Sequence, residues 1–267
     1  MSTPQHGPSS KEMSMLMTKR MEASPCGGVR VVLGVPTYGP PDPRCQKDIR
    51  VAMMMASVFG AVWVGDASPD RVGFNAARNM IAQSVVGDGE IDGIVWIDSD
   101  IRIPPNAIAT MLSEAKRIDA EFMSGVYHMR GEPFGPVFYE YSEETHTFHA
   151  FKEYAENVVA PVGGCGFGFA YTSRSMIEAI AKHPEFDGNK GWFPDQRDTG
   201  GFGEDLSFCY QAIRSGVQLY VHTGIQLGHL GDTDVITQEH FRRHQASSGE
   251  DASKKAEVSG GPMWGMR

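Results

Sequence analysis

The sequence predicts an α/β fold built on a mostly parallel sheet with helices on both of its faces. Over residues 29–118, short apolar segments that end in turn residues alternate three times with segments of helical periodicity. A chain that alternates strand and helix in this way lays its strands side by side and parallel, because each helix returns the chain to the same edge. After residue 120 the pattern changes to closely spaced short strands, which predicts a mixed segment beside the parallel half.

The first half of the chain contains three expected strands and three expected helices. The strands share short runs of β-branched or aromatic residues, and the helices share apolar residues three to four positions apart. The strands are expected at 29–35, 61–64 and 94–97, and the helices that follow them at 47–59, 74–86 and 106–118. Pro104 and Pro105 begin the last of these helices, and Asn106 is its candidate N-cap.

The second half mixes short strands with two further helices. Strands are expected at 121–129, 133–141, 145–151, 167–171 and 218–222, and helices at 173–181 and 203–215. The first three of these strands follow one another through short connections, which is typical of antiparallel or mixed pairing. We therefore expect this segment to be added to the parallel half.

The composition describes one globular domain without an overall basic surface. The 267 residues suit a single α/β domain, and the 41% of hydrophobic residues can supply its core. The formal net charge of −9 disfavours nucleic acid and anionic membranes as partners. The four cysteines are scattered without a CxxC pair, which argues against a zinc ribbon or a disulfide framework and favours a reducing, cytoplasmic location.

Both ends of the chain are expected to be disordered tails around one folded domain. Residues 1–28 and 245–267 are rich in small and polar residues and show no clean periodicity. The domain is therefore expected to span 29–244. No apolar run is long enough to predict a membrane span, and the N-terminus lacks the apolar region of a secretory signal.

The clearest chemical signal is GIVWIDSDIRIPP, residues 93–105, in which an apolar strand runs directly into Asp98 and Asp100. Two like charges this close repel each other unless a cation lies between them. Ligands of open parallel sheets bind beyond the carboxyl ends of the strands. Carboxylate oxygens suit Mg²⁺ or Mn²⁺, which also take phosphate oxygens and water. An isolated pair of this kind is more often an ordinary solvated loop, but its chemistry suits a divalent ion held against a diphosphate.

Two further segments can add to this site. In GGFGEDLSFCYQAIRSG, residues 200–216, Glu204 and Asp205 begin a predicted helix after a glycine-rich approach that leaves room for a ligand. The helix dipole alone favours acids there, but such a carboxylate can also accept a proton from an attacking hydroxyl. In TGIQLGHLG, residues 223–231, His229 follows a predicted strand, and its imidazole would complete an oxygen shell around Mn²⁺.

Polar residues also follow the first two strands. Pro36, Thr37 and Tyr38 end the first strand, and Asp66 lies in the turn after the second. In FNAARNMIAQ, Arg78 lies either on an exposed helix face or near a nucleotide base or phosphate.

The glycine-rich segments do not match other familiar sites. PVGGCGFGFAY, residues 161–171, lacks the GxGxxG spacing of a dinucleotide site, so its glycines indicate close backbone approach to a substrate or tight sheet packing. GxxxxGK[ST] and GxSxG are also missing from the sequence, which disfavours a P-loop NTPase and a hydrolase with a serine nucleophile elbow.

The order of these motifs resembles that of the GT-A glycosyltransferases over residues 29–231: a strand ending in Pro-Thr-Tyr, an acidic turn, ARN, WIDSD, GGFGED and GH. The resemblance implies one Rossmann-like domain with a mixed acceptor-side sheet. It also implies a donor that is a nucleoside diphosphate sugar, with a UDP-sugar favoured, and Mn²⁺ or Mg²⁺ as the cofactor. The implied reaction transfers the sugar to an acceptor hydroxyl, with inversion as the favoured outcome.

The same resemblance implies a role for each candidate residue. The nucleotide would be bound by Pro36, Thr37, Tyr38, Asp66, Arg78, Asp98 and Ser99. The metal would be held by Asp98, Asp100 and His229. The catalytic carboxylates would be Asp205, as the base, and its neighbour Glu204. Leu206 and Ser207 follow where related inverting enzymes carry further acids, which is a departure from the family pattern.

Two other functions stay open. A nucleotidyltransferase that forms sugar nucleotides shares the α/β layout and a metal-binding aspartate, but it would carry a glycine-rich basic loop after the first strand. GVPTYGPPDPR, residues 34–44, lacks that loop. A non-catalytic nucleotide-sugar binding module is the second alternative. For a transferase, the acceptor could be a saccharide, a protein, a small molecule or a modified DNA base, and a retaining route and the oligomeric state also stay open.

Overall fold

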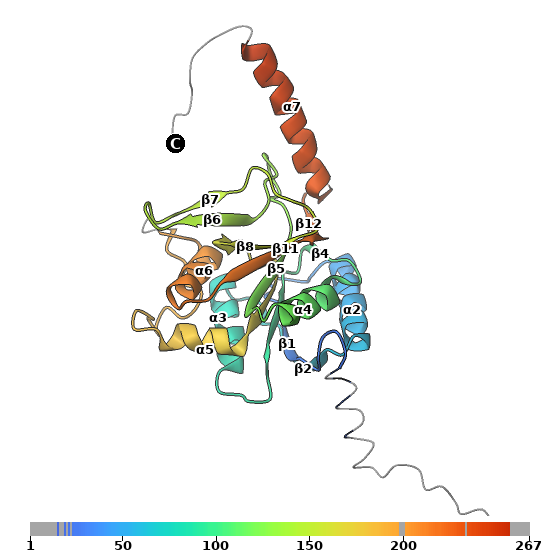
Figure 1. Cartoon of the computed structure of the whole chain (residues 1–267), viewed down its shortest axis with the longest axis vertical. Helices are drawn as coiled ribbons and strands as arrows, with labels where there is room; N and C mark the ends of the chain where they lie inside the picture. The colour runs from blue at the N-terminus through green and yellow to red at the C-terminus, as the bar shows by residue number, and fades with distance from the viewer. Residues whose placement is uncertain are drawn as a thin grey trace, which may run out of the picture.

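The computed structural model describes residues 15, 19, 21, 23–197, 201–232 and 234–256, except for the side chains of residues 248–256. Most of the predicted N-terminal tail and the last part of the C-terminal tail therefore lie outside the described residues. The molecule is an α/β body from which helix α7 (Gln238–Ala256) projects (Figure 1). None of the helices described combines the length and the apolar character that crossing a bilayer requires.

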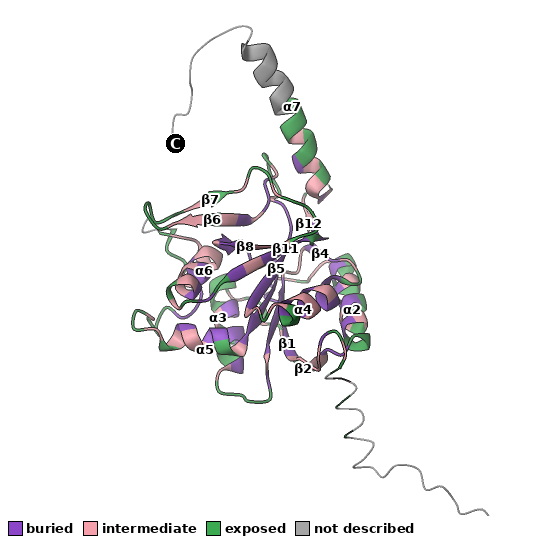
Figure 2. Ribbon diagram, viewed as in Figure 1, coloured by how far each residue is buried: buried purple, intermediate pink, exposed green. Residues whose placement is uncertain are grey.

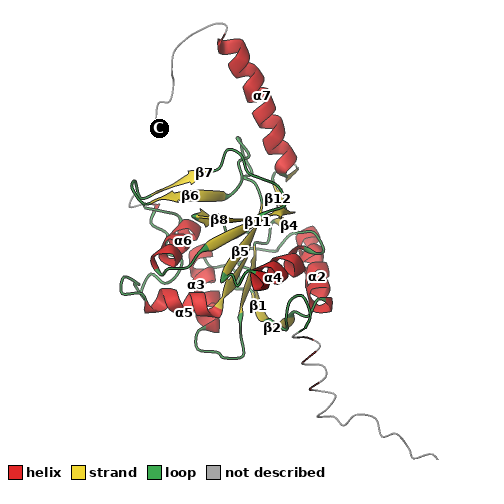
Figure 3. Ribbon diagram, viewed as in Figure 1, coloured by secondary structure: helices red, strands yellow, loops and turns green. Residues whose placement is uncertain are grey.

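A mixed sheet of seven strands forms the centre of the body (Figure 3). In spatial order its strands are β2 (Val62–Ala67), β1 (Arg30–Gly34), β3 (Gly93–Ile97), β10 (Phe169–Ser173), β5 (Phe122–Val126), β11 (Leu219–Gln226) and β8 (Val159–Val162). β1, β2, β3, β5 and β11 run in one direction, whereas β10 and β8 run in the other. The predicted α/β class and the mostly parallel sheet are confirmed.

Helices cover both faces of this sheet, and each face has its own hydrophobic core (Figure 2). One core includes residues of α3 (Phe74–Val85), α5 (Arg174–Lys182) and α6 (Glu204–Arg214), and the other those of α2 (Pro43–Val58) and α4 (Ala107–Arg117). Successive side chains of a strand point to opposite faces. In β3, Ile94 and Trp96 therefore enter the first core, and Val95 and Ile97 enter the second.

Two smaller sheets flank the main sheet. One consists of β4 (Ile101–Arg102), β12 (Gly228–Leu230) and β13 (Val235–Ile236), and the other of β6 (Phe138–Ser142), β7 (Thr147–Ala150) and β9 (Gly164–Cys165). In the first of them His229 pairs with Ile101. This pairing lays the segment that follows β11 beside the turn that follows β3.

The second half of the chain differs from the sequence prediction in where β5 lies. β5 is parallel to β11 and antiparallel to β10, so its pairing is mixed, as expected for 121–129, but it lies inside the main sheet and not in a segment added beside it. All five residues of β5 are buried, and a strand buried on both faces gives an apolar run without the alternation that would reveal its neighbours. Only β6 and β7 form the expected antiparallel hairpin, and they lie in a separate sheet.

The folded body also includes residues outside the expected bounds of 29–244. Cys26 is buried, and its backbone N–H donates to the carbonyl of Phe59 at 2.9 Å. At the other end α7 continues past residue 244 as a single helix. Phe241 of this helix is buried, with its ring 5.7 Å from the ring of His128.

Local hydrogen bonds determine where some of the helices begin. Asp42 accepts a hydrogen bond from the N–H of Arg44 at 2.7 Å and caps α2, which starts at Pro43. Ser173 caps α5 by accepting from the N–H of Met176 at 3.0 Å. Asn106 occupies the N-cap position of α4, as the sequence predicts, but its side chain makes no capping hydrogen bond.

We expect the substitution Gly93→Ala to destabilise the sheet. A Cβ at Gly93 would lie 2.4 Å from the carbonyl oxygen of Thr172, which is backbone of β10 and cannot rotate away. The strain should lower the free energy of unfolding by about 1–3 kcal/mol. Gly89→Ala is the matched control because a Cβ there meets open space, and it should stay within about 0.5 kcal/mol of the wild type. Urea unfolding of both variants measures the difference, and equal midpoints would contradict the prediction.

Candidate active site

The carboxyl ends of the parallel strands carry most of the polar residues that the sequence singles out. β1, β2, β3, β5 and β11 run in the same direction, so the turns that follow them lie at one edge of the sheet. β10 runs the other way and begins at this edge, directly after Gly168. The polar side chains here form two groups, one around Arg78 and one around Asp100 and His229.

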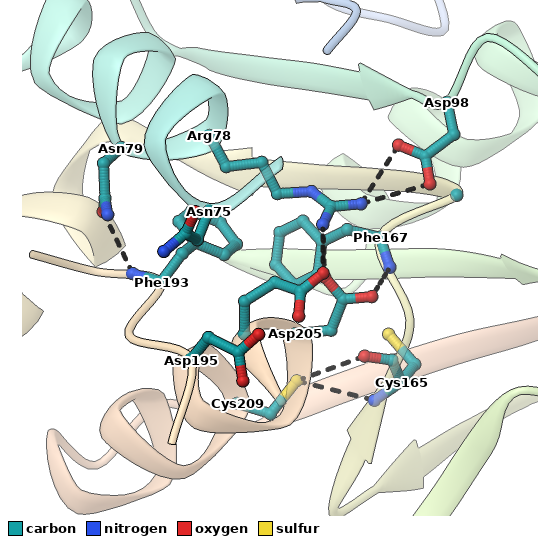
Figure 4. Close-up of polar contacts among 12 residues, drawn as sticks. Asn75, Arg78, Asn79, Asp98, Cys165, Phe167, Phe193, Asp195, Asp205 and Cys209 are labelled. Atoms are coloured by element: carbon teal, nitrogen blue, oxygen red, sulfur yellow. Dashed lines mark hydrogen bonds and ion pairs between the residues drawn. The ribbon is translucent and has the colours of Figure 1, made fainter. Parts of the chain in front are cut away.

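Arg78 of α3 is the centre of the first group and has three carboxylates around it (Figure 4). Its Nη2 donates to the two oxygens of Asp98 at 3.0 and 3.1 Å. Its Nη1 donates to Glu204 Oε1 at 3.2 Å and lies 2.9 Å from Asp205 Oδ1, the latter as an ion pair without hydrogen-bond geometry. The Arg78 side chain is 3% exposed. One buried cation therefore balances three acids.

Aromatic rings and charge together hold the guanidinium of Arg78. The ring centroids of Phe74 and Phe167 each lie 5.8 Å from its Cζ, which is within cation–π range. Burial disfavours the charged guanidinium, but the neighbouring carboxylates outweigh burial, and the pKa of Arg78 lies above its ordinary value. The sequence left open an exposed helix face for Arg78, and its burial makes that alternative wrong.

The pKa values of the carboxyls in this group are raised, whereas the carboxyl of a surface ion pair usually has a lowered pKa. Burial raises the pKa of Asp98 to about 6, although Arg78 opposes the rise. Burial also raises the pKa of Asp205, again against the influence of Arg78. A carboxylate of raised pKa accepts a proton more readily at neutral pH than an ordinary one does.

The glycine-rich loop before β10 joins Asp98 to Asp205. The N–H of Asp98 donates to the carbonyl of Gly168 at 3.0 Å, and the N–H of Phe167 donates to Asp205 Oδ2 at 3.1 Å. The hydroxyl of Tyr127 accepts from the N–H of Gly168 at 3.1 Å, and a Cβ on that glycine would lie 2.8 Å from the tyrosine Cζ. Of the two interpretations of these glycines, tight packing within the protein is confirmed.

Asp100, His229 and Arg130 form the second group. Asp100 Oδ2 lies 3.7 Å from His229 Nε2. Arg130, which follows β5, donates from Nε to His229 Nε2 at 2.9 Å and contacts Asp100 Oδ2 through Nη2. The N–H of Leu230 donates to the carbonyl of Asp100 at 2.9 Å and holds the two turns together.

Asp100 and His229 fit a divalent cation as a partial ligand set. His229 Nδ1 lies 2.8 Å from the carbonyl of His128 and donates its proton there, so the lone pair of Nε2 faces Asp100. Burial lowers the pKa of His229, which keeps the imidazole neutral at pH 7. Within the described residues, no three side chains of His, Cys, Asp or Glu gather into a complete metal cage. Water and phosphate oxygens would have to supply the remaining ligands.

Asp98 and Ser99 lie between the two groups. Both oxygens of Asp98 bind Arg78, so the carboxylate that the sequence predicts as a third metal ligand faces the first group. Ser99 is partly buried in the turn between Asp98 and Asp100.

The residues predicted to line the nucleoside lie at the ends of β1 and β2. Pro36 and Thr37 are buried, and the N–H of Thr37 donates to the carbonyl of Pro69 at 3.2 Å. Tyr38 is 71% exposed, and Asp66 is exposed with the hydroxyl of Ser68 bound to its carboxylate. Because β1 pairs with both β2 and β3, these turns share the edge that carries Asp98.

Sequence reasoning missed Arg130 and Tyr127. Both follow β5, and the pattern had assigned that strand to an antiparallel or mixed segment instead of the ligand-binding edge. The signal available was YHMR directly after a short apolar run, which repeats the arrangement of an apolar strand followed by polar side chains at residues 93–100.

The chain has the fold of the GT-A glycosyltransferases, an α/β unit around a mixed, mostly parallel core sheet. A197 from STIV, a protein of this fold, aligns with a TM-score of 0.51 and 17% identity over 79% of this chain and 91% of its own. GalNAc-T7, solved with UDP, GalNAc and Mn²⁺, aligns with a TM-score of 0.50 and 9% identity over 82% of this chain and 47% of its own, so this chain spans about half of that one. No family model and no curated protein matches the sequence.

Arg78→Met should destabilise the folded protein, because it takes the buried cation from Asp98 and Asp205 and leaves Glu204 only the exposed Arg197, 3.5 Å away. Removing one partner of a buried ion pair costs about 3–5 kcal/mol. Without Arg78 the pKa values of Asp98 and Asp205 rise further, so the folded state takes up protons that the unfolded state does not hold near pH 5. The stability of the variant should therefore increase as the pH falls from 7 to 5.

Chemical unfolding at pH 7 and pH 5 checks both parts of this expectation. Arg117→Met is the matched control, because it removes the same charge from an exposed pair with Glu114. The control should behave as the wild type does at both pH values. A stable Arg78→Met protein with no gain of stability at pH 5 would show that the three acids do not depend on this cation.

Proposed function

We propose that this protein is a metal-dependent glycosyltransferase that moves a sugar from a nucleoside diphosphate sugar to an acceptor hydroxyl. The observation that carries the proposal is the pair formed by Asp100 Oδ2 and His229 Nε2, 3.7 Å apart, at the carboxyl edge of a GT-A sheet. The carboxylate suits Mn²⁺ or Mg²⁺ with phosphate oxygens in its shell, and the imidazole nitrogen favours Mn²⁺ of the two. The acidic group around Arg78 lies at the same edge of the sheet and would supply the catalytic carboxylates, which begin α6.

The donor would lie along the ends of the first three parallel strands. Residues that would contact the nucleoside and its ribose are Pro36, Thr37, Tyr38, Asp66, Arg78, Asp98 and Ser99. A UDP-sugar is the favoured donor, and GalNAc-T7, which shares the fold, was solved with UDP. Asp100 and His229 would hold the metal. Asp98, which the sequence predicts as a third ligand, binds Arg78 through both of its oxygens and would have to leave it to reach the metal. When bound, the ion supplies a positive charge that stabilises the departing diphosphate.

Asp205 would act as the general base. Its Oδ2 is held by the N–H of Phe167, and its raised pKa suits proton acceptance near neutral pH. The carboxylate would take the proton of the acceptor hydroxyl while that oxygen bonds to the anomeric carbon and the bond to the diphosphate breaks. Attack from the opposite face gives inversion. Glu204, which shares Arg78 with Asp205, would keep the base oriented.

The first test concerns donor binding. Asp100→Asn should abolish the Mn²⁺-dependent part of UDP binding, because an amide replaces the charged metal ligand, and calorimetry of UDP with and without Mn²⁺ measures it. Asp119→Asn is the matched control, since Asp119 precedes β5 and so lies toward the opposite edge of the sheet. The control should bind as the wild type does. Identical metal dependence in the Asp100 variant would remove Asp100 from the site.

The second test concerns turnover. Asp205→Asn should leave UDP and Mn²⁺ binding in place and lower the transfer or hydrolysis of a UDP-sugar by about 10²–10⁴-fold, the usual contribution of a general base. The assay should offer saccharides, peptides, small molecules and hydroxylated DNA bases as acceptors. Wild-type activity that survives this substitution contradicts the role of Asp205. Release of pyrophosphate from a nucleoside triphosphate and a sugar phosphate would indicate a nucleotidyltransferase, and binding without turnover would indicate a binding module.

A further inference from the structure

The guanidinium of Arg130 occupies the space between the two side chains proposed to hold the metal. Its Nε–H donates to His229 Nε2 at 2.9 Å, and its Nη2 contacts Asp100 Oδ2. These are the nitrogen and the oxygen that a divalent ion at this place would use. Arg130 therefore takes the position of a cation in this structure.

Arg130 and a metal ion cannot use His229 at the same time. The imidazole has one lone pair, at Nε2, because Nδ1 donates its proton to the carbonyl of His128 at 2.8 Å. That lone pair either accepts the Arg130 hydrogen bond or coordinates a metal. The two arrangements are alternatives, and the free energy of the arginine contacts is lost when a metal ion enters.

The surroundings of Arg130 allow its side chain to leave. The side chain is 55% exposed, in contrast to 3% for Arg78 in the neighbouring group. The backbone on each side of it is hydrogen-bonded, since the N–H of Met129 donates to the carbonyl of Gly135 at 2.9 Å and the N–H of Phe134 donates to the carbonyl of Gly131 at 2.8 Å. Only the side chain needs to move for the two ligands to become free.

We propose that Arg130 competes with the divalent ion for Asp100 and His229 and so makes tight metal binding depend on the donor. The inference rests on the proposed function. Metal alone has to displace a guanidinium from a carboxylate. When a nucleoside diphosphate arrives with the metal, its phosphate oxygens supply new partners for the displaced Arg130, because a guanidinium pairs with phosphate in bidentate geometry. Arg130 thus weakens the binding of metal in the absence of the donor and couples metal binding to donor binding.

The experiment measures the affinity of the full-length protein for Mn²⁺ alone by calorimetry or by the electron paramagnetic resonance of free Mn²⁺. Arg130→Met should bind Mn²⁺ about tenfold tighter than the wild type or more, within the usual range of coupling between two sites. Arg130→Lys, which keeps the charge without the planar fork, should fall between them. Addition of UDP should tighten Mn²⁺ binding by a larger factor in the wild type than in Arg130→Met.

Arg117→Met serves as the charge-matched control, since it removes one positive charge from an exposed pair in α4. It should bind Mn²⁺ as the wild type does. Unfolding curves for each variant establish that it is folded. If Arg130→Met binds Mn²⁺ no tighter than the wild type while both bind UDP with Mn²⁺, the competition is refuted and the proposed function stands. If neither protein binds Mn²⁺ or UDP, both proposals are refuted.

Discussion

The ion cluster around Arg78 is the constraint on which the rest of the site depends. A guanidinium on α3 meets carboxylates that follow β3 and begin α6, so two consecutive elements and a helix more than a hundred residues later are tied together at one point. Each acid alone would be costly to desolvate, and each is tolerated because the same cation serves all of them. The position of Asp98 follows from this cluster, and the short turn after it then fixes Asp100 at the start of the neighbouring group.

The two groups at this edge use their arginines differently. Arg78 is enclosed by aromatic rings and protein carboxylates, which makes it a permanent part of the architecture. Arg130 reaches its partners from a solvent-exposed position, and its guanidinium contacts His229 and Asp100, the two residues proposed to hold a metal. A fixed charge beside the proposed catalytic acids and an exchangeable charge at the proposed metal site fit the proposed reaction, in which a cation and an anionic donor arrive together.

Periodicity predicted the parallel half of the fold because each strand there is followed at once by a helix with clear apolar spacing. The same reasoning failed at β5, since its buried run FMSGV contains no information on which strands lie beside it. That error hid Arg130, which lies four residues beyond the end of β5. Asp98, Asp100 and His229 could be proposed as site residues because acids after a strand and a histidine between glycines are visible locally. The burial of Arg78 was not predictable, since it depends on acids more than a hundred residues further along the chain.

The placement of β10 between β3 and β5 has a consequence for synthesis of the protein. β3 is apolar on both faces, and one of its edges pairs only with β10, whose residues leave the ribosome about 70 positions later. A nascent chain therefore carries GIVWI with an open edge for several seconds at ordinary rates of translation. Strands of this kind are prone to pair with other chains. Dependence on a holdase chaperone during production is the expected result of this topology.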